Sequence, residues 1–228
     1  IVYIRYNQMA SLVKVSFFQI KEELKESLPI FLSSAATSVY TASFVVVLGF
    51  FATASEVGHY SVADRLMRAV TLITFIPLSQ AFYPKISRMA KENMEQAKQL
   101  LKKIVILIGG VELVIGMIFF FFSTSILNFL GKDYSSAEII LKVMSFIPVF
   151  IGVGGVFAQL GLLAMGTDQA KKFYSKTYFY AAIIALVSVL VLVYFYAANG
   201  AAIALFLTEL FVCLMMMGGF MKFVQKQC

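Results

Sequence analysis

Long apolar runs separated by charged segments organise this sequence. Six runs are each long enough for the roughly 20 residues that an α-helix needs to cross a bilayer. We place these predicted spans at residues 28–51, 59–82, 104–122, 138–163, 176–196 and 200–220. Only residues 197–199 separate the last two spans, which predicts a tight antiparallel hairpin. The pattern therefore predicts an all-α integral membrane protein, built as a bundle of six transmembrane helices.

The segment before the first span, residues 1–27, contains the amphipathic stretch VSFFQIKEELKES. Such a helix either lies along the membrane surface or connects two halves of a protein, and both interpretations stay open. Pro29 is expected at the start of the first spanning helix, and residues 221–228 are expected to form a cytoplasmic tail. The chain begins at Ile1 without an initiator Met or a signal-peptide core, so we expect it to be the later part of a longer polypeptide.

Composition and charge support the membrane class. Of the chain's residues, 61% are hydrophobic and only 14% are charged. In soluble domains about half of the residues are apolar and about a quarter are charged. Its net charge of +7 comes from Lys and Arg residues on alternate connections: before the first span, between spans two and three, between spans four and five, and after the sixth. The positive-inside rule explains this alternation better than nucleic-acid binding does. We expect a multi-pass protein of the cytoplasmic membrane, with both ends of this segment in the cytoplasm.

The second span carries charges that membrane helices rarely contain. A charged side chain there costs roughly 3 to more than 10 kcal/mol, so it usually faces a water-filled cavity or a partner. Polar residues recur at spacings of three and four along one helical face: Ser61, Asp64, Arg65, Arg68 and Thr71.

Arg65 and Arg68 suit an anionic phosphate ligand, since a guanidinium group binds two phosphate oxygens at once. Alternatively, Asp64 pairs with Arg68 as a structural clamp while Arg65 extends to the outer interface. The two interpretations are compatible.

Other spans hold fewer polar residues. Thr37 belongs to a row of small residues in the first span, which either packs against a helix or forms a polar wall of a substrate cavity. Glu112 and Glu209 lack a partner in their own helices, so each forms a structural hydrogen bond or takes up a proton during transport. Glu138 and Lys142 are predicted to neutralise each other at i,i+4.

Prolines interrupt two of the predicted spans. Pro77 lies in the second span and Pro148 in the fourth, and both remove a helical hydrogen bond. The resulting bends are hinges or static kinks.

Signatures of enzymes and metal sites are absent from the sequence. It contains no glycine-rich phosphate loop, no H-E-x-x-H and no nucleophile with a nearby base. His59, the single histidine, lies at an outer membrane edge, and Cys213 and Cys228 have no disulfide or zinc spacing. We therefore predict a transporter rather than an enzyme, without catalytic residues, metal or organic cofactor; a proton or sodium ion is the coupling partner to consider.

Two motifs resemble a known family. VGHYSVADRLMRAV, followed by PLSQAFYPKISRM, is similar to the second span after the midpoint in polysaccharide flippases for O-antigen and capsule repeat units. These flippases belong to the multidrug/oligosaccharidyl-lipid/polysaccharide exporter superfamily. KEELKESLPIFLSSAATSVYTASFVVVLGFFA resembles the segment just before it. The resemblance is specific over residues 20–105 and rests on hydropathy beyond them.

The resemblance implies two six-helix lobes around a cavity that opens alternately to either side of the membrane. This chain is similar to the second lobe with its connector, so the implied partners are an N-terminal lobe of the same polypeptide and membrane lipids. The implied activity is transfer of an undecaprenyl-pyrophosphate-linked oligosaccharide from the inner to the outer leaflet. Arg65 and Arg68, with Asp64, match the cationic cavity wall, and Ser61 and Thr37 would line the path.

Two other functions stay open. One is a membrane scaffold or assembly subunit whose charged residues only pair helices. The other is an exporter of small organic cations, which a basic cavity wall disfavours because like charges repel.

Overall fold

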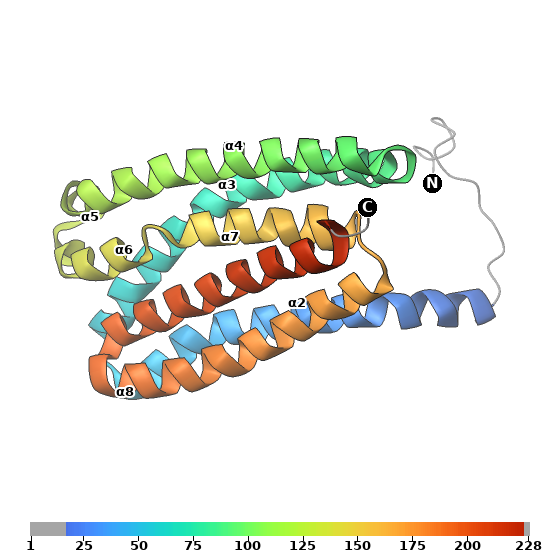
Figure 1. The fold of residues 1–228 in the computed structure, drawn as a ribbon. Coiled ribbons are helices and arrows are strands. Elements are labelled where there is room, and N and C mark those ends of the chain that lie inside the picture. Colours follow the sequence, from blue (N-terminus) through green and yellow to red (C-terminus); the bar gives the residue numbers. More distant parts are fainter. Residues whose placement is uncertain (1–16, 226–228) are drawn as a thin grey trace, which may run out of the picture.

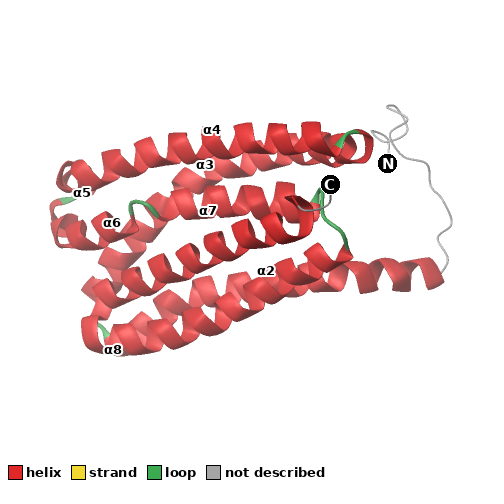
Figure 2. Cartoon of the chain, in the orientation of Figure 1, coloured by secondary structure: helices red, strands yellow, loops and turns green. Residues whose placement is uncertain are grey.

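The computed structural model describes residues 17–225 of the chain as a bundle of helices (Figures 1 and 2). No strand occurs among these residues. The predicted all-α class is therefore confirmed. In chain order the elements are α2 (Phe17–Phe51), α3 (Ala54–Glu92), α4 (Met94–Phe121), α5 (Ser123–Leu130), η1 (Lys132–Ala137), α6 (Glu138–Met144), α7 (Ile147–Gly155), η2 (Val156–Leu163), α8 (Asp168–Phe220) and η3 (Met221–Gln225).

Five segments of the described chain are long and apolar enough to cross a membrane. The last of them contains α8, which reverses direction at Ala197, where φ is 47° and ψ is −128°. The reversal divides α8 into two antiparallel legs, residues 168–196 and 198–220 (Figure 1), and it lies at the predicted hairpin. The chain is a multi-pass membrane protein.

Two helices continue through prolines at which the sequence predicts a boundary or an interruption. α2 does not begin at Pro29 but runs without a break from Phe17, and the preceding residues 1–16 of the predicted connector lie outside the described part. α3 extends over 39 residues and contains both Pro77 and Pro84. Membrane helices tolerate proline because neighbouring groups satisfy the backbone that the ring leaves unpaired.

The predicted fourth span is not one continuous α-helix. α6 ends at Met144, the chain bends at Ser145 and Phe146, and α7 begins at Ile147 with Pro148 in its first turn. A proline costs little there because first-turn N–H groups have no partner within the helix. Beyond α7 the helix widens into the π-helix η2.

Side-chain caps set where α3 and α4 begin. The Thr53 hydroxyl accepts a hydrogen bond from the Glu56 N–H at 3.3 Å, and the Glu56 carboxylate accepts one from the Thr53 N–H at 2.9 Å, which is a capping box. Asn93 ends α3 and caps α4, accepting a hydrogen bond from the Gln96 N–H at 3.0 Å. These caps fix the two sharp turns that reverse the chain on either side of α3.

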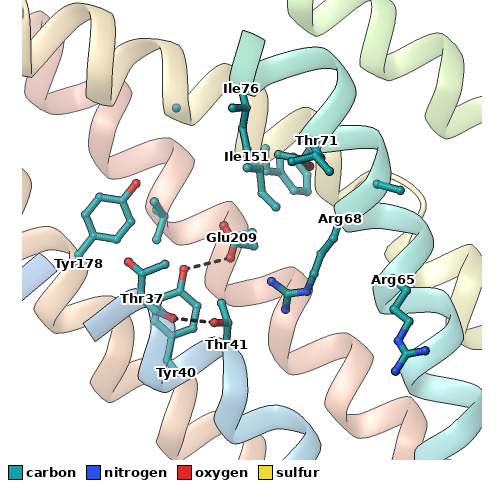
Figure 3. Close-up of a pocket in the computed structure, with 15 residues that line it drawn as sticks. Thr37, Tyr40, Thr41, Arg65, Arg68, Thr71, Ile76, Ile151, Tyr178 and Glu209 are labelled. Carbon is teal, nitrogen blue, oxygen red and sulfur yellow. Dashed lines mark hydrogen bonds between the residues drawn. The ribbon is translucent and has the colours of Figure 1, made fainter. Parts of the chain in front are cut away.

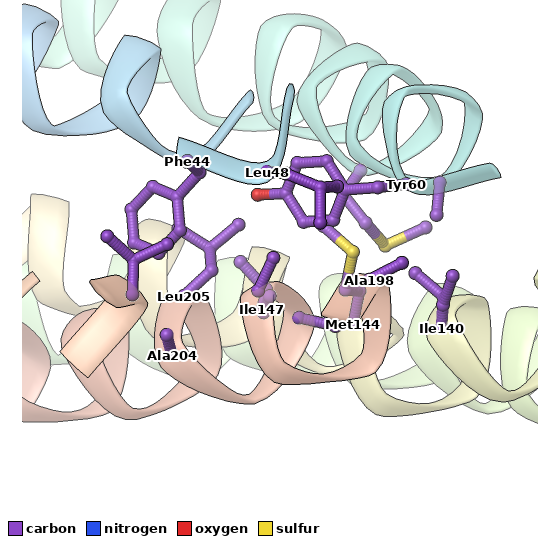
Figure 4. Close-up of a cluster of buried hydrophobic side chains, with 14 of the residues drawn as sticks. Phe44, Leu48, Tyr60, Ile140, Met144, Ile147, Ala198, Ala204 and Leu205 are labelled. Carbon is purple, nitrogen blue, oxygen red and sulfur yellow. The ribbon is translucent and has the colours of Figure 1, made fainter. Parts of the chain in front are cut away.

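Small residues bring the second leg of α8 close to its neighbours. Ala198, Ala201, Ala202 and Ala204 are all buried, and bulky side chains from other helices pack around this leg (Figure 4). Lipid is as apolar as these side chains, so close packing rather than transfer from water holds the helices together. The labelled bulky residues of this cluster are Phe44, Leu48, Tyr60, Ile140, Met144, Ile147 and Leu205.

Basic residues gather at one end of the bundle. The joint between α3 and α4, the start of α8 and the C-terminal end of the second leg all lie there (Figure 1). These segments contain most of the lysines that the sequence places on the predicted cytoplasmic connections. The arrangement fits the alternation of charge, and the side of the membrane that this end faces remains a prediction.

Candidate functional site: a polar cavity between α2, α3, α7 and α8

A cavity of about 550 Å3 opens within the bundle (Figure 3). α2, α3, α7 and both legs of α8 contribute to its wall. The polar residues that line it are Thr37, Tyr40, Thr41, Arg65, Arg68, Thr71, Tyr178 and Glu209. The larger apolar residues are Leu72, Ile76, Phe150, Ile151 and Val212. A cavity with this lining offers both charged and apolar contacts to one ligand.

Arg68 is held by Asp64 one turn earlier on α3. Its Nε donates to Oδ2 of Asp64 at 2.6 Å, so the predicted i,i+4 pair is confirmed. The Asp64 side chain is only 12% exposed, whereas that of Arg68 is 48% exposed. Because this bond uses Nε, both terminal amino groups of Arg68 are left for another partner. The structural pairing and a ligand contact are therefore geometrically compatible.

Glu209 lies opposite Arg68 and is tied to α2. The Tyr40 hydroxyl donates to Oε1 of Glu209 at 3.1 Å, and both side chains are buried. Arg68 extends from α3 toward this carboxyl group in Figure 3. Thr37 and Thr41 lie on the same face of α2 as Tyr40, and their hydroxyls donate to backbone carbonyls of α2 at 2.9 Å. Toward the cavity these hydroxyls can only accept hydrogen bonds.

Arg65 lies one turn from Arg68 and points away from Glu209 (Figure 3). It is exposed, and it also lines a neighbouring pocket of about 330 Å3 together with Leu130 and Tyr134. In the part of the chain that the structure describes, Arg65 forms no ion pair. Arg65 therefore lines both the cavity and this neighbouring pocket, without a carboxylate partner among the described residues.

The structure brings four of the predicted site residues to this cavity and separates three others. Thr37, Arg65, Arg68 and Glu209 line it; Asp64 stands behind Arg68 and contributes with Glu209 to a small adjoining pocket. Two predicted residues, Ser61 and Glu112, are not among the lining residues. Away from the cavity, Lys142 and Glu138 pair at 2.6 Å, as predicted.

Two tyrosines of the wall, Tyr40 and Tyr178, were not predicted. Aromatic residues in apolar spans usually pack in the core, and a tyrosine near the end of a span is typical of the interfacial belt. A usable signal was present for Tyr40, which follows Thr37 by three residues on one helical face. For Tyr178 we find no such signal.

The arrangement offers charged, hydrogen-bonding and apolar contacts to a ligand. Two guanidinium groups and acceptor hydroxyls line the cavity, with one carboxyl group opposite. Residues 17–225 contain no group of three or more His, Cys, Asp or Glu side chains that could hold a metal ion. An arginine side chain binds two phosphate oxygens at once, and the apolar wall can pack against a hydrocarbon chain. The lining therefore fits a ligand that contains both a phosphate group and a hydrocarbon chain.

Comparisons with known proteins give two curated relatives and a family. Residues 1–90 match the model of a family described as "Polysaccharide biosynthesis protein". A "Putative O-antigen transporter" of Shigella dysenteriae is 33% identical over 215 residues, which cover 94% of this chain and 52% of the relative. A protein of the same name from Escherichia coli (strain K12) is 30% identical over 210 residues, which cover 90% of this chain and 49% of the relative.

The chain thus spans about half the length of the curated relatives it matches. No solved structure matches it. The matches confirm the family resemblance that the motifs of residues 20–105 indicate.

Proposed function

We propose that this chain belongs to the polysaccharide biosynthesis family of membrane proteins, which its matches support, and that it forms one lobe of an alternating-access flippase. Its substrate is an undecaprenyl-pyrophosphate-linked oligosaccharide, carried from the inner to the outer leaflet of the cytoplasmic membrane. The other lobe belongs to the same polypeptide. Rocking of one lobe against the other exposes the cavity first to one side of the membrane and then to the other.

The observation that carries the proposal is the pair of arginines in the wall of a membrane-embedded cavity. Arg65 has no carboxylate partner in the described residues, and Arg68 keeps its terminal amino groups free of the bond to Asp64. Both can contact the oxygens of a pyrophosphate. The lipid chain then lies against the apolar wall near Leu72 and Ile76.

The test is complementation of surface polysaccharide by the full-length protein in a strain without its own flippase. We expect wild type to restore the polysaccharide and an Arg65→Ala, Arg68→Ala variant to fail at equal membrane abundance. A Lys85→Ala, Arg88→Ala variant is the matched control. It removes two charges at the same spacing from the same helix, outside the cavity. Restoration by all three proteins would refute a binding role for Arg65 and Arg68.

Direct binding separates the pyrophosphate from the lipid chain. Undecaprenyl pyrophosphate should raise the melting temperature of the purified full-length protein, because a ligand stabilises the state that binds it. Undecaprenol, which lacks the phosphates, should raise it less. The difference should disappear in the Arg65→Ala, Arg68→Ala variant and persist in the Lys85→Ala, Arg88→Ala variant.

The scaffold alternative makes a different prediction for the same residues. If Asp64 and Arg68 only clamp α3, exchanging them for each other should preserve function, since the pair at i,i+4 is retained. The flippase proposal expects the exchange to fail, because the guanidinium moves one turn away from the position opposite Glu209. An exporter of organic cations is disfavoured because two arginines and only one carboxyl group line the cavity.

A further inference from the structure

Glu112 on α4 is a buried carboxyl group that the cavity does not use. It is 0% exposed and lies near the middle of a helix that crosses the membrane. Oε1 lies 2.7 Å from the Thr74 hydroxyl of α3, which also lies 2.8 Å from the Val70 carbonyl oxygen and donates its one hydrogen to either acceptor. Oε2 has no hydrogen-bond partner in the described structure. Oε1 of Glu112 therefore has a hydrogen-bond partner, whereas Oε2 is buried without one.

The backbone of α7 closes directly over the unpaired oxygen. Gly152 faces Glu112, and a methyl group at residue 152 would occupy the space that Oε2 fills. On the same seam, Gly109 of α4 faces Val153, and Gly116 of α4 packs against the backbone of Ser145. Glycines on both helices thus let α4 and α7 approach so closely that water has no room beside Oε2.

No ion pair of the described residues includes Glu112. Thr74 from α3 and Gly152 from α7 contact the carboxyl group, and neither titrates. The charged pair of α6, Glu138 and Lys142, is engaged with itself. A carboxylate without a cation or a full set of hydrogen bonds is strongly disfavoured in a dry site. The packed arrangement therefore suits the neutral acid and opposes the ionised form.

α7 is bounded by irregular backbone at both ends. The bend at Ser145 and Phe146 separates it from α6, and the π-helix η2 follows at Val156. Breaks and π-helical segments are places where a membrane helix changes its path. α7 can therefore shift as a short rigid unit without the rest of the fourth span moving with it.

We propose that Glu112 is a proton-binding site whose ionisation requires α7 to move away from α4. When the seam opens at Gly152, water reaches Oε2 and the O–H bond breaks, releasing the proton to water. When a proton returns and the O–H bond forms again, the neutral acid lets α7 close over it. This rests on the proposed function only in assigning the movement to a step of alternating access.

The first experiment observes the proton itself and needs no substrate. Infrared difference spectra of the purified full-length protein in lipid, recorded along a pH titration, should contain a protonated-carboxyl band that is lost as pH rises. Glu112→Gln keeps the size and the Thr74 contact and should remove this band. Glu209→Gln is the control and should leave it in place. A titration unchanged by Glu112→Gln overturns the proposal.

The second experiment observes the seam. In a background with Cys213→Ala and Cys228→Ala, Val153→Cys places a thiol opposite Gly109. A water-soluble maleimide should label this thiol increasingly as pH rises, and Glu112→Gln should abolish the increase. Labelling that is independent of pH, or equal in both proteins, overturns the link between ionisation and opening.

An export assay then tests whether the protonation of Glu112 and the movement of α7 are needed for transport. Glu112→Gln should abolish surface polysaccharide while the melting-temperature shift with undecaprenyl pyrophosphate is retained, because the arginine cavity is untouched. Normal export with a lost infrared band refutes the coupling and leaves the flippase proposal intact. Loss of the ligand shift in wild type refutes the flippase proposal and leaves the proton site standing.

Discussion

The Asp64–Arg68 pair allows the structural and binding roles of Arg68 to be separated. Arg68→Ala removes a cation and leaves Asp64, whose side chain is 12% exposed, without its partner. A second variant, Asp64→Ala with Arg68→Ala, removes both charges. Both variants lack the Arg68 guanidinium, but only Arg68→Ala leaves a buried carboxylate without an ion-pair partner.

The exposure of each partner sets the expected magnitude. Breaking a fully buried ion pair costs about 3 to 5 kcal/mol, whereas an exposed pair contributes about 0 to 1 kcal/mol. Asp64 is nearly buried, but the 48% exposure of Arg68 lets cavity water screen the pair. We expect Arg68→Ala to lower the free energy of unfolding by about 2 kcal/mol, and the double variant to recover about half of this loss.

The assay is unfolding of the purified full-length protein in mixed micelles by SDS titration, followed by circular dichroism. Arg88→Ala is the control, since Arg88 is an exposed cation on the same helix and should change stability by less than about 0.5 kcal/mol. Export is measured on the same proteins. Under the proposed function the double variant is well folded and yet does not export, and export by this variant would contradict a binding role for Arg68.

Two results would contradict this reasoning. Equal stability of Arg68→Ala and wild type would mean that Asp64 needs no partner in its site. A double variant as unstable as Arg68→Ala would mean that the cost arises from lost packing of the arginine stem and not from a stranded charge.

Three further substitutions test local features by the same unfolding assay. Ala197→Gly should stabilise the protein by up to about 1 kcal/mol, because a φ of 47° is strained for alanine and not for glycine; a loss of stability would contradict this. Tyr40→Phe should cost about 1 to 2 kcal/mol by leaving Oε1 of buried Glu209 without its donor; no change would show that this bond contributes nothing. Gly152→Ala should cost about 1 to 3 kcal/mol by overpacking, and Glu112→Ala in the same protein should recover part of it; equal costs with and without Glu112 would place the clash elsewhere.

The passes through the membrane follow from the sequence, but the shape of the fourth one does not. A bilayer forces long apolar runs and internally bonded helices, so hydropathy alone predicts the all-helical class and the hairpin at residues 197–199. The bend at Ser145 and the π-helix that begins at Val156 depend on how neighbouring helices pack. Pro148 marks the neighbourhood of the bend without giving its form.

The sequence predicts which residues share a face of a single helix, but not which helices come together at the candidate site. Periodicity placed Arg65 and Arg68 on one face of α3, but it cannot say which other helices that face meets. Glu112 and Glu209 illustrate the limit, because each is a lone carboxyl group in an apolar run. In the structure Glu209 lines the cavity and binds Tyr40, while Glu112 is enclosed between α4 and α7. Only tertiary packing distinguishes the two.

The length of α3 has a practical consequence. With 39 residues it measures about 58 Å, against about 30 Å for the hydrocarbon core, so roughly half of it projects beyond the bilayer. Asn93, where α3 meets α4, is the tip of this projection. Residues 83–92, which follow the predicted span 59–82, form about 15 Å of helix on the Asn93 side, so a tilt of α3 by about 10° at the membrane surface would carry the tip through about 2.6 Å. A fluorophore at Asn93 would therefore magnify movements of the cavity wall while remaining far from any ligand.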